Sequence, residues 1–169
     1  MKIPVFVSCP TSLNRKQQAC RQIILRELER LELEPRAIGR SDYPTILPLR
    51  EVLMLAGHCA GGIILGFEQY YSEMGVRKRG INGQQARVTS PVPFPTPWNH
   101  LEAGILFGLK LPLLVFREDG ITGGIFDNGV TDIFIHGMPH PKLPISEKRA
   151  LSAVFLKWQA DVRGIYYQK

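Results

Sequence analysis

Residues 61–67 read Gly-Gly-Ile-Ile-Leu-Gly-Phe, and this uninterrupted apolar stretch decides the fold. A strand with one face in water alternates apolar and polar side chains, whereas a strand covered on both faces is apolar throughout. Residues 2–9 and 112–116 are similar, largely apolar runs, and shorter ones occupy residues 35–38 and 132–136. Strands of this kind belong to parallel sheets that lie between layers of helices. The sequence therefore predicts several strands in one buried sheet.

Amphipathic segments separate these strands. Apolar side chains recur at helical spacing over residues 14–33, 47–56, 96–110 and 146–162. Thr96 is the expected N-cap of the third helix, with Pro97 at its first position, and Ser146 is the expected cap of the fourth. Strands that alternate with helices form a parallel sheet with right-handed crossovers. We expect a single α/β domain over residues 1–169, a flavodoxin-like three-layer fold with strand order 2-1-3-4-5 and helices on both faces.

Residues 68–95 interrupt this rhythm. They carry three of the prolines, Pro91, Pro93 and Pro95, together with the basic run 77–79 and Arg87. Structureless connections of this length in a compact domain are either functional lids or disordered insertions. We expect a long lid-like loop at about residues 68–95, beside the site where the chain binds its ligand.

Composition excludes several classes of protein. No apolar run approaches the roughly 18 residues of a membrane-spanning helix, and the first residues do not form a signal peptide, so we expect a cytoplasmic protein without a membrane partner. The three cysteines lack CxxC spacing, which favours thiols over disulfides or a metal site. The formal charge of +6 favours an anionic partner, and it fits either a phosphate-bearing small molecule or a mild attraction to nucleic acid. Nucleic acid is the least favoured partner, because no nucleic-acid-binding motif is present.

Glu102 is the first candidate for chemistry. Helical spacing gathers apolar side chains around it on one arc of the predicted helix, namely Trp98, Leu101, Ile105, Leu106 and Leu109. Removing an ionised carboxylate from water costs several kcal/mol unless it is paired, protonated or facing a cleft. Glu102 is therefore either a functional carboxylate or a residue at the edge of the arc that reaches water.

Ligands of such sheets gather beyond the carboxyl ends of the strands, which here means the loops after Val7, Leu65 and Phe116. The candidate substrate-binding residues in or beside these loops are Ser8, Cys9, Pro10, Phe67 and Trp98. Candidates for closing over phosphates are Arg77, Lys78, Arg79 and Arg87. The glycine-rich residues 120–129 are either a plain turn or a second phosphate contact. A carboxylate in a semi-apolar, aromatic-lined site suits cleavage of an N-glycosidic bond, because it stabilises an oxocarbenium-like transition state.

Two family resemblances point to the same chemistry. Residues 98–102, Trp-Asn-His-Leu-Glu, resemble the Trp-Cys-x-x-Glu box of TIR domains, and residues 5–8, Val-Phe-Val-Ser, resemble their first strand. Residues 7–10, with Glu-Ala-Gly at 102–104 and the run 108–114, resemble the pattern of nucleoside 2-deoxyribosyltransferases. Both families have a flavodoxin-like core and use a helix-borne Glu on an N-glycosidic bond, TIR enzymes in NAD and the transferases in deoxynucleosides.

These resemblances imply that Glu102 is the catalytic carboxylate of an N-glycosidase, a hydrolase, or of a transferase, with NAD or a related nucleotide as substrate and no required cofactor. The resemblance to TIR domains also implies a role in bacterial antiviral defence. Two departures leave a second interpretation open. Asn99 stands where TIR domains have Cys, and residues 95–98 replace the Asp-x-Gly-Thr element of the transferases. The alternative is a non-catalytic nucleotide-sensing or protein-interaction module that assembles into a homo-oligomer.

Overall fold

The centre of the molecule is a sheet of five parallel strands. The computed structural model describes residues 2–39, 47–131 and 133–168. The strands are β1 (Ile3–Ser8), β2 (Leu33–Arg36), β3 (Gly62–Gly66), β8 (Leu113–Arg117) and β9 (Ile135–Gly137). They lie in the order β2-β1-β3-β8-β9, and every pairing is parallel. Counted along the chain, this is the predicted order 2-1-3-4-5, so the flavodoxin-like three-layer fold is confirmed.

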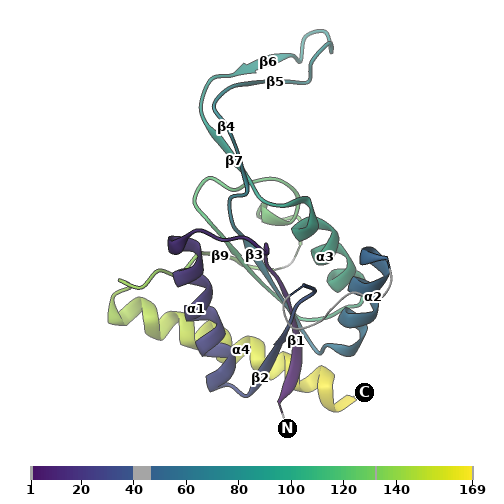
Figure 1. Ribbon diagram of the computed structural model, residues 1–169, viewed down its shortest axis with the longest axis vertical. Helices are drawn as coiled ribbons and strands as arrows, with labels where there is room; N and C mark the ends of the chain where they lie inside the picture. The colour runs from purple at the N-terminus through teal and green to yellow at the C-terminus, as the bar shows by residue number, and fades with distance from the viewer. Residues whose placement is uncertain (1, 40–46, 132, 169) are drawn as a thin grey trace.

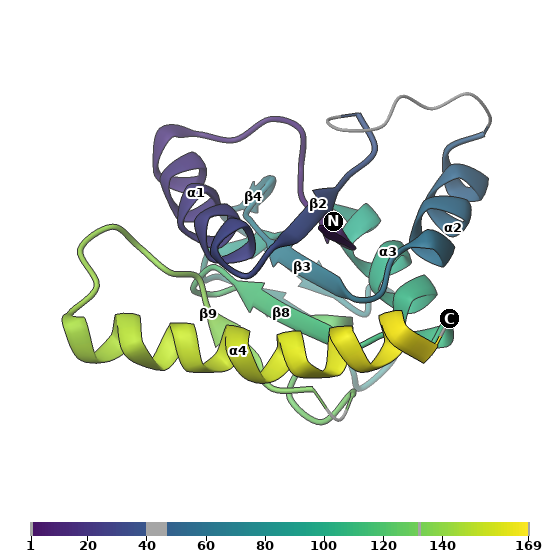
Figure 2. The same cartoon turned by 90° about the horizontal axis from the view of Figure 1, so that it is seen from below.

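Helices cover both faces of the sheet (Figures 1 and 2). Helices α1 (Arg15–Arg30) and α4 (Ile145–Gln168) lie on one face, and α2 (Pro48–His58) and α3 (Pro97–Gly108) lie on the other. Each face has its own hydrophobic cluster, because successive side chains of β1 point to opposite sides. Val5 packs with α1 and α4, whereas its neighbour Phe6 packs beneath α2 and α3. Full burial of one such side chain contributes roughly 1.5–3 kcal/mol.

The start of each helix follows from its first residues, with one exception. Asn14 caps α1 in a capping box, since its side chain accepts from the Gln17 amide at 2.9 Å and the Gln17 side chain accepts from the Asn14 amide at 3.1 Å. Thr96 caps α3 with Pro97 at the first helical position, as predicted. The prediction for the last helix is wrong, because α4 begins at Ile145 and Ser146 lies inside its first turn.

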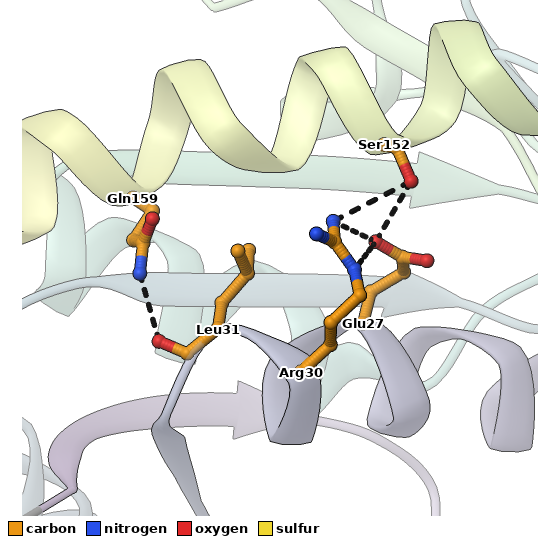
Figure 3. Close-up of polar contacts among 5 residues, drawn as sticks. All are labelled: Glu27, Arg30, Leu31, Ser152 and Gln159. Carbon is orange, nitrogen blue, oxygen red and sulfur yellow. Dashed lines mark hydrogen bonds and ion pairs between the residues drawn. The ribbon is translucent and has the colours of Figure 1, made fainter.

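Polar contacts fasten α4 to α1 (Figure 3). The Gln159 side-chain amide donates to the Leu31 carbonyl at 2.7 Å, so it satisfies one of the carbonyls that the end of α1 leaves without a helical partner. One turn earlier in α1, the Glu27 carboxylate accepts from the Ser152 hydroxyl at 3.1 Å and pairs with Arg30 at 2.6 Å. The exposed ion pair contributes little by itself, but the buried Gln159 contact fixes the position of the long helix.

Residues 68–95 contain strands that the sequence did not predict. β4 (Tyr70–Ser72) pairs with β7 (Val92–Phe94), and β5 (Gly75–Arg77) pairs with β6 (Ala86–Val88), both antiparallel. Together they form an arm that projects from the body of the domain (Figure 1). Prolines argue against a central strand, but each strand of a two-stranded ribbon is an edge strand, where a missing amide is tolerated.

Several predicted boundaries are shifted. The strand expected at residues 35–38 is β2 at Leu33–Arg36, and it tolerates Pro35 because it lies at the edge of the sheet. The strand expected at residues 132–136 is β9 at Ile135–Gly137, while Asp132 lies outside the described residues. Helix α1 ends at Arg30, soon followed by Glu32 in a left-handed conformation with φ 58°. Register with the neighbouring strands decides the ends of β2 and β9.

Candidate functional site

The candidate site lies at the point where the strand order of the sheet reverses. β1 and β3 are neighbours, and the chain continues outward from them in opposite directions, to β2 and to β8. Ligands of open parallel sheets bind in the crevice outside the carboxyl ends of such a pair. β1 ends at Ser8 and β3 ends at Gly66, and α3 packs across both strands. The first turns of α3 therefore lie at this edge.

Three side chains from β1 and α3 form a hydrogen-bonded group there. Asn99 is fully buried, and its Nδ2 donates to the Ser8 Oγ at 2.7 Å. Hydrogen bonding to the Ser8 side chain in turn lowers the pKa of the Glu102 carboxyl. Since an amide nitrogen only donates, the hydroxyl proton is directed to the carboxylate. These hydrogen bonds form a short chain from Asn99 through Ser8 to Glu102.

Burial controls the charge of Glu102. Removal of the carboxyl group from water raises its pKa from 4.5 to about 7, and the hydrogen bond from Ser8 opposes that rise. A carboxyl group with this pKa is present in both protonated and ionised forms at neutral pH. It is thus suited to donate a proton and to act as an anion in one reaction cycle.

The buried face of α3 differs from the predicted arc. Trp98 and Leu101 are 40% and 48% exposed, whereas Asn99, Ala103 and Leu106 are buried. The helix is thus rotated by roughly a quarter turn from the orientation that its apolar pattern predicts. Two contacts with the sheet account for this. Asn99 bonds to Ser8, and Leu106 lies where a Cβ on Gly62 would be only 2.7 Å away.

Asn99 also carries an unsatisfied group. Its Oδ1 is buried and has no hydrogen-bond partner among the residues that the structure describes. Leaving a buried acceptor unpaired costs about 1–3 kcal/mol, so such groups in native proteins are usually met by water or a ligand. Asn99 therefore offers an acceptor next to Ser8. No local pattern marks Asn99 as a site residue, and in the sequence it stands out only as a departure from the TIR pattern.

The glycine-rich turn at residues 120–129 covers the first turn of α3. Arg117, the last residue of β8, donates from Nη1 to the Ile121 carbonyl at 3.0 Å and to the Phe126 carbonyl. The Asp127 carboxylate accepts from the Gly123 amide at 2.8 Å. Gly123 has φ 96°, a left-handed conformation that favours glycine. The turn is therefore fixed by side chains at both of its ends.

His100 contacts this turn. Its ring meets Phe126 edge-on with centroids 5.4 Å apart, and a Cβ on Gly124 would lie 2.8 Å from its Nδ1. Burial lowers the pKa of His100, while the nearby Asp127 acts in the opposite direction. The imidazole is therefore mostly neutral at pH 7 and serves as a packing surface for residues 123–126.

A second polar cluster lies at the same edge, on the side of α1. The buried Gln17 donates from Nε2 to the Glu68 carbonyl and to the Glu118 carboxylate, both at 3.0 Å. The same carboxylate accepts from the Glu68 amide at 2.7 Å. These bonds join α1 to the segments that follow β3 and β8. The sequence did not identify Gln17 or Glu118, since the partners are far apart in the chain.

The structure brings only some of the predicted site residues together. Ser8 contacts Glu102, and Trp98 lies one helical turn before it with a partly exposed ring. Cys9 and Pro10 follow Ser8 directly, and the Cys9 thiol donates to the Pro10 carbonyl at 3.5 Å. All three cysteines are present as thiols.

Phe67 and the basic residues lie elsewhere. Phe67 is fully buried in the cluster beneath α1 and α4, so its ring is part of the core and does not form the expected wall of a pocket. Arg77, Lys78, Arg79 and Arg87 belong to β5, β6 and the turn between them. These strands form the outer part of the projecting arm (Figure 1), so the arm as described does not close over Glu102.

A cavity of about 1210 Å³ lies at the other end of α3, between its last turn, β8 and α4. Its lining mixes apolar side chains such as Phe107 and Trp158 with Lys110 and Lys157. None of Ser8, Asn99 and Glu102 contributes to it. The cavity lies near the amino end of β8, whereas ligands of parallel sheets bind at the carboxyl ends. We therefore place the candidate site at Glu102.

Among the described residues, no group of three or more His, Cys, Asp or Glu side chains could hold a metal ion. Within the same part of the chain, no helix combines the length and the apolar character needed to span a bilayer. Comparisons with protein-family models, curated proteins and solved structures found no match.

Proposed function

We propose that the protein cleaves or transfers at an N-glycosidic bond of a nucleotide or nucleoside, with Glu102 as the catalytic carboxylate. One observation carries this proposal. A carboxyl group whose pKa is raised to about 7 is held by Ser8 at the carboxyl ends of β1 and β3, where the strand order reverses. Perturbed carboxyl groups in such crevices are candidates for acid–base and nucleophilic roles.

The chemistry uses both protonation states of one group. In cleavage, the bond between the sugar C1′ and the base nitrogen breaks, and the bonding electrons leave with the base. Positive charge develops on the sugar, and ionised Glu102 stabilises it across a short distance in a site partly withdrawn from water. A water molecule then bonds to C1′ and gives up a proton to the carboxylate. Nicotinamide leaves NAD as a neutral molecule, so in that case the proton passes to solvent. The base of a deoxynucleoside leaves as an anion and takes the proton from Glu102. Transfer replaces this water with a second acceptor.

Neighbouring groups support substrate binding in this proposal. The exposed part of the Trp98 ring provides an apolar face for a base or for nicotinamide. The resemblance to TIR domains favours NAD, and that to deoxyribosyltransferases favours deoxynucleosides. A cytoplasmic location and a role in antiviral defence rest on these resemblances and on composition.

The test is release of free base from NAD and from deoxynucleosides by the purified protein. Wild type should release base from at least one of them, and Glu102→Gln should lose at least a hundredfold in rate, because an amide cannot carry the charge. Glu68→Gln is the matched control, since Glu68 is an exposed glutamate at the same sheet edge and should retain activity. Equal release by wild type and Glu102→Gln would overturn the mechanism. Tight nucleotide binding without turnover would instead support the sensing module.

A further inference from the structure

The arm, residues 70–94, is the most exposed part of the described chain and has no role in the proposed chemistry. It leaves the body between β3 and α3, and the Gln69 amide closes its base by donating to the Phe94 carbonyl at 2.8 Å. None of its residues belongs to either hydrophobic cluster. Because the arm adds no side chain to either cluster and approaches the rest of the domain at Pro93, near its base, most of both faces is open to a partner.

Charge defines the kind of partner. The arm carries four basic side chains and a single acidic one, Glu73, so it holds +3 of the formal charge of +6. Arg87 lies opposite Val76 on one face of the ribbon, and Arg77 lies opposite Ala86 on the other. Lys78 and Arg79 occupy the turn that follows β5. The outer half of the arm, which consists of β5, β6 and the turn between them, is therefore positive on both faces and at its tip. It complements a chain of phosphates.

Exposed aromatic side chains characterise the inner half of the arm, which consists of β4 and β7. Tyr70 and Phe94 are directly opposite each other on one face and are 66% and 46% exposed. Tyr71 faces the other way, paired with Pro93, which approaches the turn at Gly120. The Tyr70–Phe94 pair thus faces away from that turn. Exposed rings beside basic side chains are the arrangement on which unpaired bases stack.

A second copy of this chain fits the arm poorly. The whole chain is positive, so a copy would bring like charge to the basic outer half. A polyanion has no such penalty and also uses the exposed rings. The sequence disfavoured nucleic acid for want of a motif, but the arm gathers basic and aromatic residues that are dispersed along the sequence into one ribbon.

We propose that the arm binds single-stranded nucleic acid, with phosphates along the basic outer half and bases stacked on Tyr70 and Phe94. Binding does not require Glu102, so this proposal stands apart from the catalytic one. Four phosphate contacts predict a slope of about −3 when the logarithm of affinity is plotted against that of salt concentration, roughly a 50-fold loss between 50 and 200 mM.

The experiment is fluorescence anisotropy with labelled single-stranded DNA and RNA oligonucleotides of mixed sequence, across that salt range. The variant Arg77→Ala/Lys78→Ala/Arg79→Ala/Arg87→Ala should lose most of the affinity and most of the salt dependence. The control Lys142→Ala/Lys148→Ala/Arg149→Ala/Arg163→Ala removes the same charge from exposed positions in and before α4 and should bind as wild type. Tyr70→Ala and Phe94→Ala should each weaken binding by roughly five- to a hundredfold.

Further outcomes are equally decisive. Glu102→Gln should bind the oligonucleotides as wild type does, and this result separates arm binding from catalysis. An equal loss of affinity in the arm variant and the control would reduce the effect to net charge and overturn the proposal. Duplex binding as tight as single-strand binding, with no effect of Tyr70→Ala or Phe94→Ala, would also overturn it. So would a dimer that the arm variant abolishes. Circular dichroism should confirm that every variant is folded.

Discussion

The Asn99 side-chain amide donates to the Ser8 hydroxyl at 2.7 Å, joining the first turn of α3 to the end of β1 across 91 residues of chain. The contact is buried, so it is stronger than the same bond in water. It also decides where the Ser8 proton points. Because Asn99 occupies a lone pair of the hydroxyl oxygen, the proton is available to Glu102. The charge of Glu102 therefore depends on Asn99, three residues earlier in α3.

Ser8→Ala tests this dependence. The variant loses the hydrogen bond that lowers the pKa of Glu102, so that pKa should rise above about 7. It also leaves the buried Asn99 Nδ2 without its acceptor, at a cost of about 1–3 kcal/mol in the free energy of unfolding. An NMR titration of glutamate carboxyl carbons and urea unfolding measure the two effects. Ser12→Ala changes an exposed serine on the same segment and should change neither value. An unaltered pKa of Glu102 in Ser8→Ala would contradict its hydrogen bonding to Ser8.

Glu102→Gln should change how stability depends on pH. Glu102 has an ordinary pKa of 4.5 and a folded-state pKa of about 7, so the folded state binds a proton that the unfolded state releases between these values. Stability of the wild type therefore falls as pH rises through this window. The variant lacks this loss and should gain up to about 3 kcal/mol on wild type between pH 4 and pH 8.

Urea unfolding of both proteins across this pH range measures the gain. Glu68→Gln is the matched control, a Glu-to-Gln change at an exposed position of the same sheet edge. A constant difference between Glu102→Gln and wild type at all pH values would mean that the carboxyl group titrates normally in the folded state.

Gly66→Ala should destabilise the fold by about 1–3 kcal/mol, because a Cβ at the end of β3 would overlap the Phe126 ring. Gly104→Ala is the matched control. That glycine is exposed within α3, nothing lies within 4 Å of its added Cβ, and alanine should stabilise the helix by about 0.5–1 kcal/mol. Thermal and urea unfolding give both values. Opposite signs are expected for the two substitutions, and a tolerated Gly66→Ala would show that the turn at residues 120–129 is free to move.

Glu118→Ala should cost about 1–3 kcal/mol of unfolding free energy, since it removes the acceptor shared by Gln17 and the Glu68 amide. The loss of local stability should be largest at the base of the arm and at the start of α1, because the lost bonds join these two segments. Hydrogen exchange of the Glu68 amide reports on this locally. Asp119→Ala, at the exposed neighbouring position, should leave both the stability and this exchange rate unchanged, so equal effects of the two substitutions would argue against the cluster.

Local patterns in the sequence predicted the fold well. Runs without polar alternation gave the buried strands, and the alternation of strands with helices led to the order 2-1-3-4-5 that the structure has. Thr96 and Pro97 located the start of α3, because capping depends only on neighbouring residues. The arm was missed, since its strands have three residues each and the last of them, β7, contains Pro93 between Pro91 and Pro95.

The site depends on contacts that no local pattern contains. Glu102 was selected because of an apolar arc that proved to be rotated, yet the carboxyl group is withdrawn from water all the same. The packing of Leu106 against Gly62 sets that rotation. The rotation cannot be predicted without knowing which strand lies beneath the helix. Asn99 and Gln17 became visible only when their partners, 91 and 101 residues away, were placed beside them.

The arm begins and ends on one pair of opposed residues, Tyr70 and Phe94, whose backbones lie about 5 Å apart as neighbouring strands do. A short turn could therefore replace everything beyond them, and neither hydrophobic cluster would lose a side chain. The arm is thus an appendage that joins the α/β core at a single point. The length and the charge of the arm can therefore change in evolution without affecting the residues around Glu102.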